Sequence, residues 1–142
     1  ASLRQKFYSP QPRLVLANQA RSLLHAGIDV SDGLAADLGH MARASGLVAQ
    51  VELASLPRDS LLLHYLDSDQ QERAILYGGD DYELCLAVAP EQLAALMTLA
   101  EKLALPCTVI GRFSEPEGVE AGVVLLDASG ELIAAGSAYS HF

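Results

Sequence analysis

Two short acidic segments carry the residues of this chain that are best suited to chemistry. The first runs from Asp29 to Gly33 and contains two carboxylates and a serine hydroxyl. The second, Gly78-Gly79-Asp80-Asp81, has two carboxylates directly after a glycine pair. Neighbouring carboxylates repel one another unless a cation neutralises their charge. The two segments therefore point to a bound divalent cation and, through it, to phosphate chemistry.

The first acidic segment has two interpretations. Asp29 and Asp32 are three residues apart, so a turn can direct both carboxylates at one hard cation, while Ser31 donates to a phosphate oxygen. The N-terminus of the helix expected next would also favour an anion. Alternatively, Ser31 or Asp32 is only a helix N-cap. The second segment has a similar alternative, in which Gly78-Gly79 ends a helix and the two aspartates are solvated.

Other phosphate, metal and nucleophile motifs do not fit the chain. No Gly-x-x-x-x-Gly-Lys-Ser/Thr sequence occurs, so a P-loop is excluded. An EF-hand that began at Asp29 would need its bidentate Glu at the position of His40. Ser31 has no nearby histidine to activate it, and a nucleophilic triad therefore has no support.

Composition sets the class of protein. With 142 residues, 51% of them hydrophobic, the chain is long enough for one domain with a buried core. Its formal net charge of −9 argues against nonspecific nucleic-acid binding, which requires a basic surface. Cys85 and Cys107 form no CxxC pair and lie in strand-like apolar runs, so we expect buried thiols in a cytoplasmic protein. No apolar run reaches membrane-spanning length, and we expect no membrane association.

The hydrophobic pattern predicts alternating helices and strands. Helices are expected over Leu14 to Leu24, Leu34 to Ala44, Pro57 to Leu66, Gln70 to Leu76, and from Pro90 with an apolar face of Leu93, Leu96, Met97, Ala100 and Leu103. Strands are expected over His25 to Val30, Leu47 to Leu53, Tyr82 to Val88, Cys107 to Arg112, Val123 to Asp127 and Leu132 to Ala135. The last two strands should form a hairpin around Ser129-Gly130. This order favours an α+β or layered α/β fold.

Five short elements follow one another along nearly the whole chain. They are Pro10-x-Pro12-Arg13, Gly27-Ile28-Asp29-Val30-Ser31-Asp32-Gly33-Leu34-Ala35-Ala36-Asp37-Leu38, Tyr77-Gly78-Gly79-Asp80-Asp81-Tyr82-Glu83-Leu84, Val109-Ile110-Gly111-Arg112 and Tyr139-x-His141-Phe142. Together and in this order they resemble the C-terminal half of the thiamine-monophosphate kinase family.

The resemblance implies a fold and an activity. The fold would be like the C-terminal domain of aminoimidazole ribonucleotide synthetase, with a mixed sheet packed against helices. The activity would be Mg²⁺-dependent transfer of the ATP γ-phosphate to thiamine phosphate, which gives thiamine diphosphate in thiamine biosynthesis, by a homodimer. Residues 1–13 would be a linker from a missing N-terminal domain and residues 14–142 the C-terminal domain. Since the family's N-terminal half supplies most ATP and metal ligands, we expect negligible kinase activity from this chain alone.

The resemblance also implies roles for individual residues. Asp29 and Asp32 match Mg²⁺ ligands, and Ser31 matches a contact to ATP. Asp80 and Tyr139 match residues that contact thiamine phosphate. The family usually has Glu at the position of Asp80, so the carboxylate here is one methylene shorter. No residue is predicted to be a catalytic base, because the acceptor phosphate is already an anion.

Two alternatives remain open at this point. The chain could belong to another ATP-dependent enzyme of the aminoimidazole ribonucleotide synthetase superfamily, acting on a different small phosphate or carboxylate. It could also be a non-catalytic domain that binds a metabolite or a partner. Assays with different acceptors separate the first alternative from the kinase, and calorimetry with Mg²⁺, ATP and thiamine phosphate tests the second.

Overall fold

The computed structural model describes residues 8–58, 64–80 and 82–135. The helices and strands in these ranges are, in chain order, α2 (Leu14–Ala20), β1 (Leu24–Val30), α3 (Leu34–Ser45), β2 (Val48–Glu52), the 3-10 helix η1 (Leu53–Ser55), α4 (Ser68–Tyr77), β3 (Glu83–Val88), α5 (Pro90–Lys102), β4 (Gly111–Ser114), β5 (Gly122–Leu126) and β6 (Leu132–Ala135). No helix in the described ranges is long and apolar enough to cross a bilayer.

The strands form two sheets. β1 and β3 pair antiparallel as a two-stranded ribbon, and the larger sheet has the order β4-β2-β5-β6. Within the larger sheet β2 and β5 are parallel, while the pairs β2–β4 and β5–β6 are antiparallel. The mixed sheet and the hairpin of β5 and β6 are therefore both confirmed.

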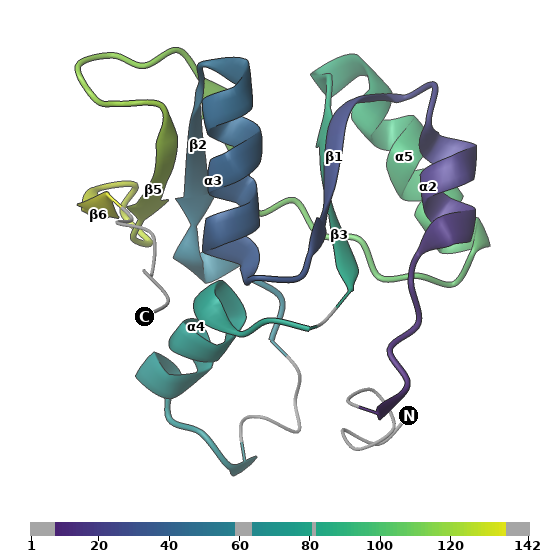
Figure 1. Cartoon of the computed structure of the whole chain (residues 1–142), viewed down its shortest axis with the longest axis horizontal. Helices are drawn as coiled ribbons and strands as arrows, with labels where there is room; N and C mark the ends of the chain where they lie inside the picture. Colours follow the sequence, from purple (N-terminus) through teal and green to yellow (C-terminus); the bar gives the residue numbers. More distant parts are fainter. Residues whose placement is uncertain (1–7, 59–63, 81, 136–142) are drawn as a thin grey trace.

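Helix α3 lies between the two sheets, and α2 and α5 cover the far side of the β1–β3 ribbon (Figure 1). The main core joins Leu38 and Met41 of α3 to Val51 of β2 on one side and to Val30 and Cys85 of the ribbon on the other. A second core packs Leu16 and Ala20 of α2 and Leu96 of α5 against Leu24, Leu86 and Val88 on the opposite face of the ribbon. The layered α/β fold is confirmed.

Local sequence explains where the helices near the acidic segments begin and end. Helix α3 stops at Gly46, whose φ of 65° is in the left-handed region that ends many helices. Helix α4 begins with a capping box, in which the Asp67 side chain accepts from the Gln70 N–H and the Gln70 side chain accepts from the Asp67 N–H. Pro90 occupies the first turn of α5, where its missing N–H has no cost.

Three predicted elements differ from the structure. Helix α2 ends at Ala20, because Leu24 already pairs with Val88 in the ribbon. The expected helix from Pro57 is not present in its described beginning, residues 57–58, and residues 59–63 lie outside the description. The expected strand from Cys107 starts only at Gly111, where a Cβ atom would lie 1.9 Å from the Gln50 carbonyl oxygen. This close approach between β4 and β2 needs glycine at position 111, and the Ile110 carbonyl before it still accepts a hydrogen bond from the Glu52 N–H at 2.9 Å.

The predicted apolar face of α5 is correct for Leu96 and Ala100, which are buried, but Met97 is 38% exposed. Leu96 belongs to the core that packs on the ribbon, and Ala100 lies four residues later on the same side of the helix. Met97 follows Leu96 directly, so its side chain is turned by about 100° away from that of Leu96.

The two cysteines have different surroundings. Cys85 is buried in β3, as predicted, whereas Cys107 is half-buried and lies outside any strand. Burial, and secondarily the negative charge of Asp37, raises the pKa of the Cys85 thiol from 9.0 to about 11. Partial burial also raises the pKa of Cys107.

These thiols give a first testable prediction. In the native protein near pH 8, iodoacetamide should modify Cys107 well before Cys85, because the Cys85 thiol is shielded and stays protonated. Because folding raises the pKa of Cys85, the stability that the protonated thiol contributes to the folded state is complete below pH 9 and is lost as pH rises through about 11. Mass spectrometry of the labelled peptides measures the modification rates of Cys107 and Cys85. Equal rates in the folded protein would show that Cys85 is accessible.

Candidate functional site

The first acidic segment links β1 to α3. Asp29 is the second-last residue of β1 and is exposed, Ser31 is half-buried, and Asp32 is exposed just before the helix. The N-cap of α3 is Gly33, with a φ of 103° and no side-chain cap bond. The alternative in which Ser31 or Asp32 caps this helix is therefore wrong. Their side chains are left available for another role.

A buried carboxylate holds the backbone of this segment. Oδ2 of Asp37 accepts hydrogen bonds from the Ser31 N–H at 2.9 Å and from the Asp32 N–H at 3.0 Å. Asp37 is only 4% exposed. Asp37 lies within the motif from Gly27 to Leu38, but no role was predicted for it from the sequence. Its position next to Leu34, Leu38 and Met41 on the apolar face of α3 was the available signal, because a buried acid needs partners there.

The second acidic segment lies directly against the first. The Asp80 N–H donates to the Ser31 carbonyl at 2.9 Å, and the Tyr82 N–H donates to the Val30 carbonyl at 3.0 Å. These bonds continue the pairing of β1 with β3 beyond the end of the ribbon. The structure thus brings together two acidic segments that are far apart in the sequence. Asp81 and Tyr139, in contrast, lie outside the described residues.

Two glycines allow the two segments to come this close. A Cβ atom on Gly79 would lie 2.4 Å from the Ser31 carbonyl oxygen. A Cβ atom on Gly33 would lie 3.0 Å from the Tyr77 main chain, and the φ of 103° at Gly33 is itself unfavourable for other residues. Figure 1 shows this meeting point, where α4 lies below the N-terminal end of α3. Gly79 therefore does more than follow the end of α4, because it lets the second acidic segment approach Ser31.

The second segment has an unusual backbone. Asp80 and Tyr82 have φ values of 65° and 51°, a region that L-residues rarely adopt. Such conformations cost of order 1–3 kcal/mol each and persist only where the surrounding structure enforces them. The hydrogen bonds from Asp80 to Ser31 and from Tyr82 to Val30 provide that enforcement. The exposed Asp80 side chain is thereby set beside the first segment.

An ion pair between Arg13 and Glu83 joins the proline-containing motif before α2 to the motif that contains the second acidic segment. The Arg13 guanidinium donates to both carboxylate oxygens of Glu83, with Nε to Oε2 at 2.8 Å. The bond to Glu83 raises the pKa of Arg13, so the arginine stays charged. Because Glu83 is about half exposed, the pair contributes about 0–1 kcal/mol. Its main effect is to tie the chain before α2 to the start of β3, next to the second acidic segment.

The chemistry of the first segment fits a hard divalent cation. Asp29 and Asp32 offer carboxylate oxygens, and in the part of the chain that is described neither side chain has a hydrogen bond or an ion pair. Mg²⁺ is commonly bound through one or two carboxylates plus substrate phosphates. Over the described ranges, no three His, Cys, Asp or Glu residues come together as a metal group. These residues fit a share of a Mg²⁺ site rather than a closed metal centre.

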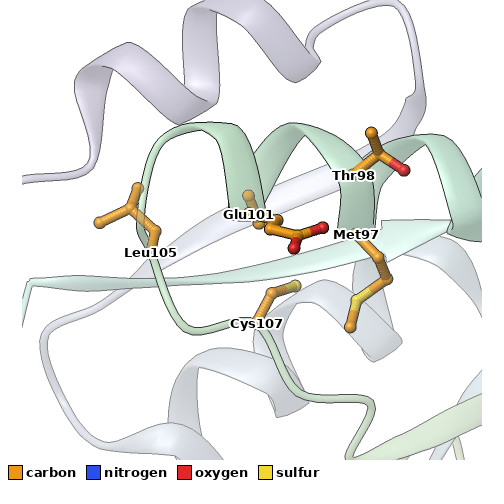
Figure 2. A pocket seen from close by; sticks show the side chains of 6 residues that line it. Met97, Thr98, Glu101, Leu105 and Cys107 are labelled. Carbon is orange, nitrogen blue, oxygen red and sulfur yellow. The ribbon is translucent and has the colours of Figure 1, made fainter.

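A cavity elsewhere on the domain is separate from this site. It lies beside α5 and is lined by Met97, Thr98, Ala100, Glu101, Leu105 and Cys107 (Figure 2). None of these residues belongs to either acidic segment. The acidic surface at the end of β1 therefore remains the candidate site.

The fold and the site define a class of protein. The chain belongs to the family described as AIR synthase related protein, C-terminal domain, which matches residues 4–124. Within that class its relatives are thiamine-monophosphate kinases, as the motif set predicted. It is 39% identical over 140 residues to the thiamine-monophosphate kinase of Haemophilus influenzae, covering 99% of this chain and 43% of the relative.

Solved structures agree with this assignment. The crystal structure of thiamine-monophosphate kinase from Stenotrophomonas maltophilia is 44% identical, with a TM-score of 0.82 over 92% of this chain and 39% of that chain. The structure of AaThiL complexed with AMPPCP and TMP is 27% identical, with a TM-score of 0.72 over 94% of this chain and 39% of that chain. The chain thus spans less than half the length of the relatives it matches.

Proposed function

We propose that this domain contributes to a composite site at which the intact protein transfers the γ-phosphate of ATP to thiamine phosphate, giving thiamine diphosphate. The observation that carries the proposal is the 2.9 Å hydrogen bond from Asp80 to Ser31, which joins the two acidic segments. One segment is suited to a metal–nucleotide complex and the other to an acceptor. The thiamine-monophosphate kinases among its relatives support thiamine phosphate as that acceptor.

In this proposal Asp29 and Asp32 hold Mg²⁺, which neutralises negative charge on the phosphates. Ser31 contacts ATP through its hydroxyl group. The N–H groups of Ser31 and Asp32 donate to Asp37 and are not free to bind a phosphate. The segment is therefore not a backbone nest for phosphate. Its contribution to nucleotide binding comes from its side chains.

Asp80 and Tyr139 are the proposed contacts to thiamine phosphate. Asp80 is exposed and lies beside the first segment, which supports its role. Tyr139 lies outside the described residues, so its role rests on the motif resemblance. No general base is assigned, because transfer to an existing phosphate anion depends on positioning and charge neutralisation.

The remaining parts of the proposal concern the whole protein. We infer that residues 14–142 act as the C-terminal domain after a linker of residues 1–13, in a cytoplasmic homodimer. Light scattering of the intact protein tests the dimer. The chain alone should show no thiamine phosphate turnover above background, because it spans less than half the length of the kinases and its described residues form no complete metal group. Measurable turnover by the purified chain would contradict this.

Acceptor selectivity tests the proposed function. The intact protein should use ATP and Mg²⁺ to phosphorylate thiamine phosphate and should not act on aminoimidazole ribonucleotide precursors. The two substrates are compared at equal concentration by following ADP release. Turnover of a precursor without turnover of thiamine phosphate would assign the domain to a different enzyme. Calorimetry that detects no binding of Mg²⁺–ATP or thiamine phosphate would instead favour a domain without catalytic function.

A further inference from the structure

We propose that Asp37 is a positioning residue that holds the Ser31–Asp32 segment in the conformation needed to bind the metal–nucleotide complex. The inference rests on the proposed function of that segment. Asp37 is 4% exposed, and its carboxylate bonds to the Ser31 and Asp32 N–H groups. Asp37 acts through the backbone of its neighbours.

The hydrogen bonds of Asp37 reach beyond the helix end. In an ordinary capping box, a side chain in the first turn returns to the N-cap residue. Here Asp37, in the first turn of α3, reaches the two residues before the Gly33 N-cap. A carboxylate acceptor makes these bonds charge-assisted, and the helix N-terminus also favours the negative charge. The bonds are therefore strong enough to define the backbone of the segment.

The opposite edge of the same segment is held by the second acidic segment. The Ser31 carbonyl accepts the Asp80 N–H at 2.9 Å, while the Ser31 N–H faces Asp37. The main chain of Ser31 is thus bonded on both sides, to α3 and to the loop after α4. Because the main chain is fixed, the positions from which the Ser31 hydroxyl and the Asp32 carboxylate project are fixed as well. Pre-organisation of this kind reduces the cost of ordering a site upon binding.

The variants Asp37→Ala and Leu38→Ala separate positioning from stability. Asp37 and Leu38 are both 4% exposed and are neighbours on α3, but only Asp37 bonds to the acidic segment. Leu38→Ala removes core packing and serves as the destabilised control. Asp37→Asn keeps one oxygen that can accept from both N–H groups, so it should restore part of the function. All variants are made in the intact protein.

Two measurements are made on each variant below its unfolding temperature. Hydrogen exchange followed by NMR reports the Ser31 and Asp32 amides, and calorimetry reports the affinity for AMPPCP with Mg²⁺. In Asp37→Ala the two amides should exchange faster and the affinity should fall, each by about tenfold or more, since both amides lose their acceptor. Asp37→Asn should be intermediate in both measurements. Leu38→Ala should leave the affinity unchanged and should not single out these two amides.

The proposal is overturned if Asp37→Ala matches Leu38→Ala in both measurements, or if the amides exchange faster with no loss of affinity. If Asp37→Ala does not fold, Asp37→Asn decides, and unchanged exchange together with unchanged affinity overturns the proposal. If the unmodified protein fails to bind AMPPCP with Mg²⁺, the proposed function fails. The amide exchange then still shows, independently, whether Asp37 holds the segment.

Discussion

Replacing Asp32 by asparagine in the intact protein should reduce the turnover of thiamine phosphate by at least about a hundredfold. Outer-shell partners of a metal typically change affinity or activity 10–100-fold, so a direct ligand should have an effect at the upper end or beyond. Asparagine keeps the size of the side chain but removes the charge that attracts Mg²⁺. Because the Asp32 side chain is exposed and bonds to no described residue, and its N–H bond to Asp37 does not involve that side chain, the fold should be unaffected. Steady-state rates over a series of Mg²⁺ concentrations measure the effect.

The same substitution at Asp29 should behave similarly, and raised Mg²⁺ should restore part of the activity in each variant. Asp69→Asn is the matched control, because Asp69 is an exposed aspartate in the first turn of α4 and belongs to neither acidic segment. It should retain normal turnover. If Asp29→Asn and Asp32→Asn both turn over substrate normally, neither residue is a metal ligand.

Replacing Gly79 by alanine should destabilise the domain and disturb the candidate site. The added Cβ atom would lie 2.4 Å from the Ser31 carbonyl oxygen, so the two acidic segments would have to separate. We expect a loss of about 1–3 kcal/mol in the free energy of unfolding, as for other overpacked sites. Separation would also break the Asp80–Ser31 hydrogen bond, and activity should fall with it. Urea denaturation and kinase assays of the intact protein measure the two losses.

Gly122→Ala is the control for this substitution. A Cβ atom on Gly122, at the start of β5, would meet no heavy atom within 4 Å, and its φ is not in the left-handed region. The change should therefore be close to neutral, within about 0.5 kcal/mol. Equal stability of Gly79→Ala and Gly122→Ala would show that the two segments do not pack as closely as described.

Elements defined by local sequence were the most predictable. Helix α3 was expected over Leu34 to Ala44 and is observed over Leu34–Ser45, because its apolar spacing and Gly46 are both local signals. The hairpin of β5 and β6 was equally predictable, since a short turn joins the two strands directly in the sequence. The end of α2 and the start of β4 were predicted less well. Both are decided by pairing with distant strands, β3 and β2, which no local pattern reports.

The site divides in the same way. The sequence by itself identified both acidic segments, because carboxylates beside glycines and a helix start have recognisable chemistry over a few residues. Only the tertiary structure decided that the segments touch, through Asp80 and Ser31, and that Gly79 is needed for the contact. It also decided that Asp37 holds the first segment in place of a side-chain cap. These bonds depend on how the loop after α4 and the first turn of α3 pack together, and hydrogen-bond geometry of that kind exists only once the domain has folded.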